Sequence, residues 1–151
     1  DAGISVLALP ATDLYLMGRA DTRNVRRGLA PLRRLAEAGV NVAVSTNNVQ
    51  SPFTPWGDAD LLRMANLLAT VTHLGTVEDL SLAFRMATGN TARAIRLRDY
   101  GLVDGARADL LLLDCREPAE AVAAIPKRLY VVKDGAVSVE HGVETIFARR
   151  R

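Results

Sequence analysis

The stretch that decides the fold is GVNVAVSTNN at residues 39–48. Its first residue, Gly39, can end a helix in the left-handed conformation, and the β-branched run behind it predicts a buried strand at 40–44. That strand leads directly into four polar residues, the 45–48 segment. Ligands of parallel α/β proteins bind just beyond the carboxyl ends of the strands, so the 45–48 segment is the first candidate for a functional site.

The same local pattern occurs a second time. DAGISV at 1–6 and EAGVNV at 37–42 both place Ala-Gly before a β-branched run, and 36 residues separate Gly3 from Gly39. This spacing is about that of one βα unit in a barrel. Because the chain opens on what reads as the end of a helix, we expect Asp1 to lie in the interior of a longer protein, just before a strand.

Hydrophobic periodicity favours a βα order through the first hundred residues. A nearly unbroken apolar run at 4–9 predicts a parallel strand that is covered on both faces. Three helices follow, and we expect Asp58 to cap the second and Thr76 with Asp79 to form a capping box for the third. The predicted helices cover 29–38, 59–74 and 77–88, with a short helical turn at 91–95.

After Tyr100 the pattern changes to short strands and turns. Asp134-Gly135 lies between two β-branched runs, which favours a tight hairpin turn. A few strands rarely form a stable unit alone, so this region is predicted to need further strands from elsewhere. The predicted strands cover 109–114, 129–133 and 136–139, with a short helix at 118–124.

The composition is that of a globular protein with a hydrophobic core. The chain has 151 residues, of which 49% are hydrophobic, and a net charge of +2 that does not indicate a nucleic-acid partner. The single Cys115 excludes an intrachain disulfide and fits a reducing compartment. No apolar run approaches the ~18 residues of a membrane span, and no signal-peptide pattern opens the chain. We therefore expect a cytoplasmic protein with no membrane partner.

Several motifs carry a family resemblance. TGNTARAIRL at 88–97 is followed by YGLVDGARADL at 100–110, and KDG comes later at 133–135. In order and spacing these motifs resemble the amidohydrolase superfamily. The segments PATDLYLMGR at 10–19 and PFTPWG at 52–57 resemble its cytosine deaminase-like branch, as the loops that follow the seventh and the last barrel strand.

The resemblance implies an α/β fold in two parts. Residues 1–100 would form the last βα units of a (β/α)8 barrel, and residues 101–151 would form strands of a partial small β-sandwich. The remaining barrel strands, with the family's H-x-H metal-binding pair, would lie upstream of Asp1. The only two histidines of the chain, His73 and His141, are not placed to form such a pair.

The resemblance also implies which residues would react. In the family, an aspartate that ligates the metal and moves protons stands at the position of Asn47. An amide is a poor ligand for a transition metal and cannot accept a proton as a base. We therefore expect no metal in this chain, and zinc or iron only in the complete family enzyme. Asp13, on the neighbouring exit loop, could supply the missing carboxylate or bind an amino group of a substrate; alternatively it only caps its own loop.

Three residues are implied to bind the substrate: Asn48, Phe53 and Trp56. Phe53 holds the place of an aromatic side chain that would cover a flat heterocycle, and Trp56 lies near it in sequence. Alternatively, the two aromatic side chains only fill a proline-rich loop.

Three functional hypotheses remain open. The first is the C-terminal portion of a metal-dependent amidohydrolase that hydrolyses a non-peptide C–N bond of an amino-heterocycle, inactive as this chain alone. The second is an amidohydrolase-like binding or scaffold protein whose catalysis has decayed. The third is a half-barrel structural module that pairs with itself or with another chain through its open strand edges. The expected partners are a small heterocycle and the upstream half-barrel, or a second copy of the chain.

Overall fold

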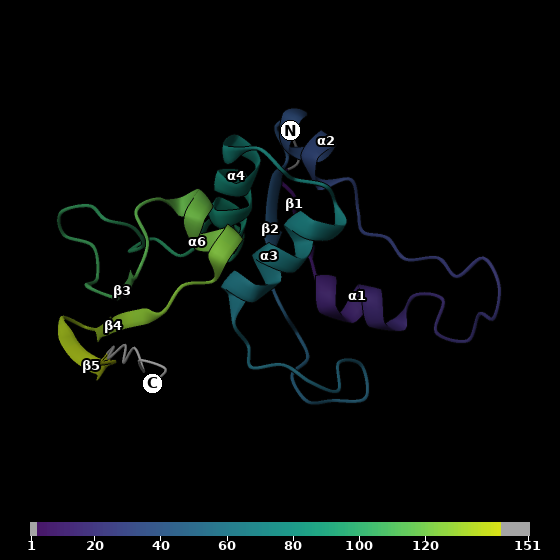
Figure 1. Cartoon of the computed structure of the whole chain (residues 1–151). Helices are drawn as coiled ribbons and strands as arrows, with labels where there is room; N and C mark the ends of the chain where they lie inside the picture. Colours follow the sequence, from purple (N-terminus) through teal and green to yellow (C-terminus); the bar gives the residue numbers. More distant parts are fainter. Residues whose placement is uncertain (1–2, 143–151) are drawn as a thin grey trace, which may run out of the picture.

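The structure, a computed structural model, describes residues 3–142 and has a mixed α/β fold (Figure 1). The helices are α1 (Pro10–Leu16), α2 (Leu32–Glu37), α3 (Leu61–Val71), α4 (Val77–Ala87), α5 (Gly89–Ala94) and α6 (Pro118–Ala124). The strands are β1 (Ser5–Ala8), β2 (Asn41–Val44), β3 (Leu110–Leu113), β4 (Arg128–Lys133) and β5 (Ala136–Glu140).

β1 and β2 form a parallel pair in which Ser5 lies opposite Asn41 and Ala8 opposite Val44. As predicted, a glycine in the left-handed conformation ends α2 before β2 begins. Gly39 has a φ of +80° and donates to Ala36, while Val40 donates to Leu35, which together close α2. Two adjacent parallel strands with helices between and after them are compatible with a barrel segment, and the barrel itself stays a prediction.

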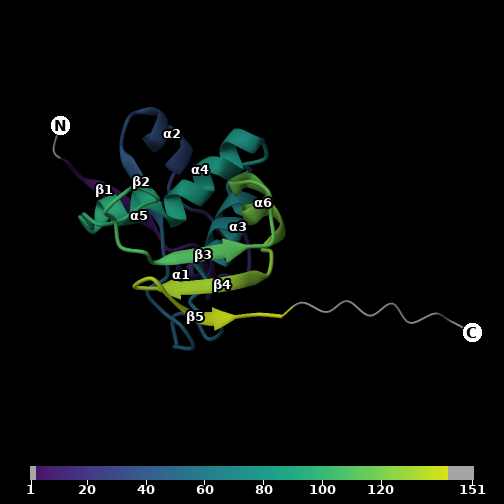
Figure 2. The same cartoon turned by 90° about the vertical axis from the view of Figure 1, so that its left-hand side faces the viewer.

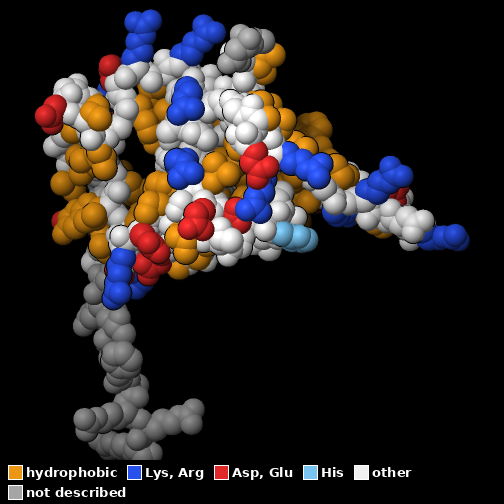
Figure 3. Space-filling view, turned by 90° about the horizontal axis from the view of Figure 1, so that it is seen from above, with side chains coloured by type: hydrophobic (Ala, Val, Ile, Leu, Met, Phe, Trp, Pro, Cys, Tyr) orange, Lys and Arg blue, Asp and Glu red, His pale blue; other side chains and the backbone are white. Residues whose placement is uncertain are grey.

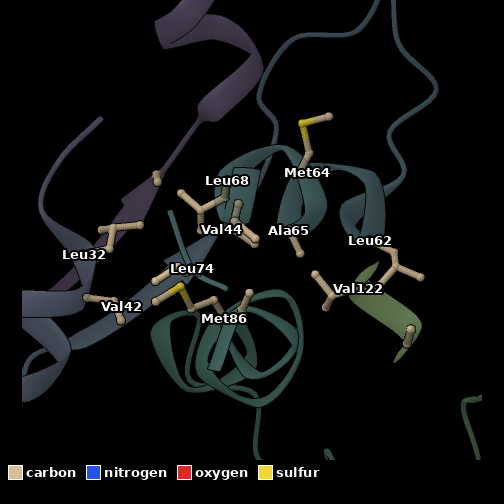
Figure 4. Packing of buried hydrophobic residues seen from close by; sticks show 14 residues of the cluster. Leu32, Val42, Val44, Leu62, Met64, Ala65, Leu68, Leu74, Met86 and Val122 are labelled. Carbon is tan, nitrogen blue, oxygen red and sulfur yellow. The ribbon is translucent and has the colours of Figure 1, made fainter. Parts of the chain in front are cut away.

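The core lies between β2 and the helices that follow it (Figure 4). Val42 and Val44 are on one face of the strand, and Leu68 of α3 and Met86 of α4 pack against them with almost no exposed surface. Val122 of α6 belongs to the same cluster, so a residue beyond position 100 completes this core. The predicted domain boundary near residue 100 stays a prediction.

The start of α4 is confirmed as a capping box. The Thr76 side chain accepts from the Asp79 N–H at 3.2 Å, and Asp79 Oδ2 accepts from the Thr76 N–H at 3.3 Å. Burial by itself would raise the pKa of Asp79. The hydrogen bonds and the positive charge of Arg33, whose Nη2 lies 2.6 Å from Asp79 Oδ1, outweigh the effect of burial and lower the pKa. The carboxylate thereby joins α4 to α2.

The structure corrects three local predictions. Residues 10–16 form α1 rather than a loop, because Pro10 provides a fixed φ at the first helical position. Asp60, not Asp58, caps α3, since its Oδ1 accepts from the N–H groups of Leu62 and Arg63. The predicted helix at 29–38 begins only at Leu32, after Pro31.

The second sheet has the order β3–β4–β5 and is antiparallel (Figure 2). Asp134 and Gly135 form the predicted hairpin turn, with φ values of +49° and +79°. Asp109 braces this turn, because its carboxylate accepts from the Asp134 N–H at 2.9 Å and pairs with Lys133. The two late motifs of the sequence are thus in direct contact. Among residues 3–142 only one layer of this sheet is present, so a β-sandwich stays a prediction.

The C-terminal region is anchored to the βα part. The Asn66 amide of α3 donates to the Val122 carbonyl of α6 at 2.9 Å, and Arg128 of β4 pairs with Asp60 at the start of α3. Within the described part of the chain, no helix combines the length and apolarity that crossing a membrane requires.

Candidate functional site

The 45–48 segment begins beside the carboxyl end of β1. The Ser45 N–H donates to the Ala8 carbonyl at 3.0 Å, which continues the parallel pairing one residue past β2. From here β1 leads into α1, and the 45–48 segment leads into the long loop before α3. The exits of both strands therefore meet at the end of the sheet where parallel α/β proteins bind ligands.

Asn47 lies at this end with an exposed side chain whose oxygen is held by two donors. Thr12 Oγ1 donates to Asn47 Oδ1 at 3.2 Å, and Asn48 Nδ2 donates to it at 2.7 Å. Asn48 is held in turn, because its Oδ1 accepts from Ser51 Oγ at 3.2 Å. With its oxygen engaged, Asn47 presents its amide N–H groups, so the group it can offer to a ligand is a donor.

Thr12 and Thr54 are site residues that the sequence did not reveal. Their hydroxyl oxygens are 2.8 Å apart, and both side chains are buried, with 8% and 4% of their surface exposed. The pair fastens the exit of β1 to the loop that follows β2. Neither threonine stands in a recognisable motif, and the only available signal was a small hydroxyl residue among apolar neighbours in 10–16.

Asp13 is half-buried and lies on α1, one residue after Thr12. Its backbone is helical, with its N–H donating to Leu9 and its carbonyl accepting from Met17, both at 2.9 Å. Within residues 3–142 its carboxylate makes no hydrogen bond or ion pair. The alternative in which Asp13 caps its own loop is therefore wrong, because the loop is a helix. A catalytic role of Asp13 stays a prediction.

The two predicted aromatic residues, Trp56 and Phe53, lie in different environments. Trp56 packs edge-on against Tyr15 of α1, with ring centroids 5.5 Å apart, and the Arg19 guanidinium lies 5.0 Å from the Tyr15 ring. Phe53 is exposed over 54% of its surface, and its backbone N–H donates to Ser51 Oγ at 3.3 Å.

A hollow of about 840 Å³ lies between α1, the 54–58 part of the loop and α3. Trp56 and Tyr15 line it, together with the ion pair of Asp58 and Arg63, whose atoms are 2.8 Å apart. Asn47, Asn48 and Phe53 do not line this hollow. The structure thus brings Asn47 and Asn48 together at the end of β2 and places Trp56 in the wall of the hollow. Thr54 connects the two regions, because it lines the hollow and also contacts Thr12.

The residues around Asn47 do not fit a transition metal. They are amides and hydroxyls, and the Asn47 oxygen already accepts two hydrogen bonds. Among residues 3–142 no three His, Cys, Asp or Glu side chains are close enough together to hold a metal ion. His73 has a φ of +57° just past the end of α3, and His141 Nδ1 is 2.8 Å from the Arg128 carbonyl.

Cys115 is not a nucleophile candidate either. Burial raises the pKa of its thiol, and the nearby carboxylates of Glu120 and Asp114 raise it further. The thiol therefore stays protonated and unreactive at neutral pH.

The sequence model of the amidohydrolase family matches residues 1–139. The chain belongs to the amidohydrolase family. Among curated relatives it is 34% identical to a pterin deaminase of Rhizobium rhizogenes over 90% of its own length, and 32% identical to an N-isopropylammelide isopropyl amidohydrolase of Pseudomonas sp. over 75%. The chain spans only about a third of these relatives, 31% and 28% of their lengths.

Its structure is similar to that of 5-methylcytosine deaminase from Klebsiella pneumoniae, solved with bound 5-fluorocytosine. The TM-score is 0.89 and the identity 33%, with 97% of this chain and 36% of that chain covered. The resemblance to amidohydrolases of the cytosine deaminase-like branch, inferred from the motifs at 10–19, 52–57 and 88–110, is therefore confirmed.

Proposed function

We propose that this chain is the C-terminal portion of a metal-dependent amidohydrolase that hydrolyses a non-peptide C–N bond of an amino-heterocycle, and that it is inactive alone. Family membership supports the hydrolytic class. The names of the similar proteins support the substrate class, since pterin, 5-methylcytosine and N-isopropylammelide are nitrogen heterocycles. In this proposal β1 and β2 with their helices are the last βα units of a barrel, and β3–β5 belong to a small β-sandwich.

One observation carries the proposal: the geometry around Asn47. The side chain lies at the shared end of two parallel strands, where its oxygen is held by Thr12 and Asn48. This is the setting in which a reacting side chain needs to be fixed, and the surrounding donors would hold one oxygen of a carboxylate equally well. The residue present is neutral, however, so Asn47 can donate to a carbonyl oxygen of the substrate but cannot remove a proton.

The proposal also assigns roles to four other residues of this chain. Asn48 completes the hydrogen-bonded end of β2, and Asp13, which directly follows Thr12 on α1, is the candidate for a base. Trp56 and Tyr15 form an aromatic wall of the hollow beside α3. The metal ligands come from outside this chain, because the residues near Asn47 do not fit a metal.

Asn47 also favours a second candidate function. A family member that has lost the reactive carboxylate can still bind a heterocycle or act as a scaffold. Placing a carboxylate at position 47 distinguishes the two functions. It should raise the rate of hydrolysis if the other reacting groups of the site are still present. It should leave the rate unchanged if the protein only binds a heterocycle or acts as a scaffold.

Complementation tests the proposal. The chain is co-expressed with the N-terminal part of the Rhizobium rhizogenes pterin deaminase that it does not match, and ammonia release from amino-heterocycles is measured. We expect Asn47→Asp to raise hydrolysis, because a single acid–base group commonly contributes ~10²–10⁴ in rate. Asn48→Asp, which adds the same charge one position away, is the matched control and should leave the rate low.

A flat response to Asn47→Asp with unchanged metal content would contradict this assignment of the site. In that case the Asp13→Asn variant tests whether Asp13 acts as the base. A collapse of activity would assign the base to Asp13, whereas no activity in any variant would support the binding or scaffold function.

A further inference from the structure

The TGNTAR motif at 88–93 contacts β2 directly. Asn90 Nδ2 of α5 donates to the Val42 carbonyl at 2.8 Å, and Thr91 Oγ1 lies 3.3 Å from the Val44 carbonyl. These contacts join residues 48 and 47 positions apart in the sequence. In Figure 2, α5 lies next to β2.

The contacted carbonyls point away from β1. Successive backbone groups of a strand face opposite edges, and the Ser45 N–H donates toward β1, to Ala8. The carbonyls of Val42 and Val44 consequently belong to the other edge of β2. The Asn90 side chain thus donates to that edge in the way a neighbouring strand would. The single proton of the Thr91 hydroxyl is shared between this edge, at 3.3 Å from the Val44 carbonyl, and the Met86 carbonyl at 2.6 Å.

Further bonds tie this edge to the rest of the molecule. At the start of β2, Asn41 Nδ2 donates to the Asn90 carbonyl at 3.0 Å and to Ser5 Oγ of β1 at 2.9 Å. Arg93 donates back to Asn41 Oδ1 at 3.3 Å. At the end of β2, Thr91 Oγ1 also lies 2.6 Å from the Met86 carbonyl of α4. The strand is therefore held at both of its ends.

We propose that Asn90 and Thr91 are positioning residues that lock β2 along its axis and thereby place the 45–48 segment. Among residues 3–142, β2 pairs with a strand on one edge only, that of β1. A strand paired in this way can slip in register, and a slip of one residue would turn Val42 and Val44 out of the core. The bonds from α5 oppose that slip. Thr91 acts closest to the site, because Val44 directly precedes Ser45. This role rests on the proposed site at Asn47.

Amide hydrogen exchange of the isolated chain tests the proposal without any substrate. Thr91→Val keeps the shape of the side chain and removes its hydroxyl, and Asn90→Ala removes the other donor. We expect exchange at Ser45 and in β2 to speed up about tenfold relative to the amides of α3, the effect of losing one hydrogen bond. Thr91→Ser retains the hydroxyl and should restore the wild-type ratio.

Asn66→Ala is the matched control, because it removes a similar bond from an asparagine amide to a carbonyl, that of Val122. It should speed exchange in α6 and leave Ser45 unchanged relative to α3. An unchanged ratio of Ser45 to α3 in Thr91→Val, or a Thr91→Ser variant that behaves like Thr91→Val, would overturn the proposal. Because the readout is independent of hydrolysis, failure of the proposed function leaves this result interpretable.

Discussion

At the scale of single residues, one hydroxyl group connects the two strand exits. Thr12 contacts Thr54 and Asn47 at once, across 42 and 35 positions of sequence. Both threonines are buried, and the Thr54 hydroxyl depends on Thr12 for its hydrogen bond, whereas Thr12 also has Asn47 as a partner. The geometry of the candidate site thus depends on a residue that itself has no acid–base chemistry.

Replacing Thr12 by Val should destabilise the chain by about 1–3 kcal/mol, because Thr54 is left buried without its partner. Urea unfolding measures the change. The double variant Thr12→Val with Thr54→Val should lose less than the sum of the single losses, since both polar groups are then gone. Thr70→Val is the control, because that hydroxyl is exposed and bonds only within α3. Additive losses would show that the two threonines do not act as a pair.

Asn47 leads to a prediction about metal content. The purified chain should contain far less than one equivalent of zinc or iron, and a chelator should leave its melting temperature unchanged, because amides and hydroxyls bind these metals weakly. Elemental analysis provides the measurement. About one equivalent of metal that disappears in Asn47→Ala would contradict the prediction. Asn66→Ala, which changes an asparagine of helix α3, is the control.

At the scale of elements, the capping box of α4 does more than begin a helix. Asp79 accepts from two backbone N–H groups, of Gly75 and Thr76, and pairs with Arg33 of α2 while only 7% of its side chain is exposed. A helix start that is also an anchor between two helices should be one of the more sensitive positions of the fold.

Asp79→Ala should cost about 1–2 kcal/mol of unfolding free energy at pH 7. The pKa of Asp79 is lowered from 3.8, so the stability it contributes is present above pH 3.8 and is lost as pH falls through the lower folded value. The difference between Asp79→Ala and wild type should therefore shrink below about pH 4. Glu78→Ala, an exposed acid in the same turn, should show a much smaller loss. A loss independent of pH would contradict the role of the charge.

At the scale of the whole molecule, a large apolar surface is exposed where β3–β5 lie. Leu111 and Leu112 of β3 are exposed over 52% and 53% of their surfaces, and Val137 of β5 over 60%. Figure 3 shows hydrophobic side chains gathered on this side of the molecule. β1 has in addition an outer edge to which no described strand pairs. Exposed apolar patches and free strand edges both promote association.

We therefore expect the isolated chain to form dimers or larger species at tens of micromolar. Leu112→Lys should shift it toward the monomer, because a charge on the exposed sheet opposes burial of that face. Val25→Lys, a similar change on the segment between α1 and α2, is the control. Light scattering gives the mass, and a well-behaved wild-type monomer would contradict the expectation.

Apart from α1, the order of elements was predicted from the sequence alone. The glycine end of α2, the buried strand β2, the capping box at Thr76 and Asp79, and the hairpin at Asp134-Gly135 all lie close to their predicted positions. Each depends on residues within a few positions of one another, because caps, turns and periodicity act over one or two turns of chain. The family was recognisable for the same reason, since its motifs are short and contiguous.

The surroundings of the candidate site were decided only by the tertiary structure. Thr12, Thr54, Asn90 and Thr91 acquired their contacts with distant segments only through the packing of the chain. Helix α1 and the Asp60 cap of α3, by contrast, are local features that were predicted wrongly from the sequence. Local pattern could not reveal these contacts, because each joins segments 42 to 48 positions apart. Which hydroxyl meets which carbonyl is determined by how the helices pack on β2, and a buried polar side chain takes whatever partner that packing brings within reach.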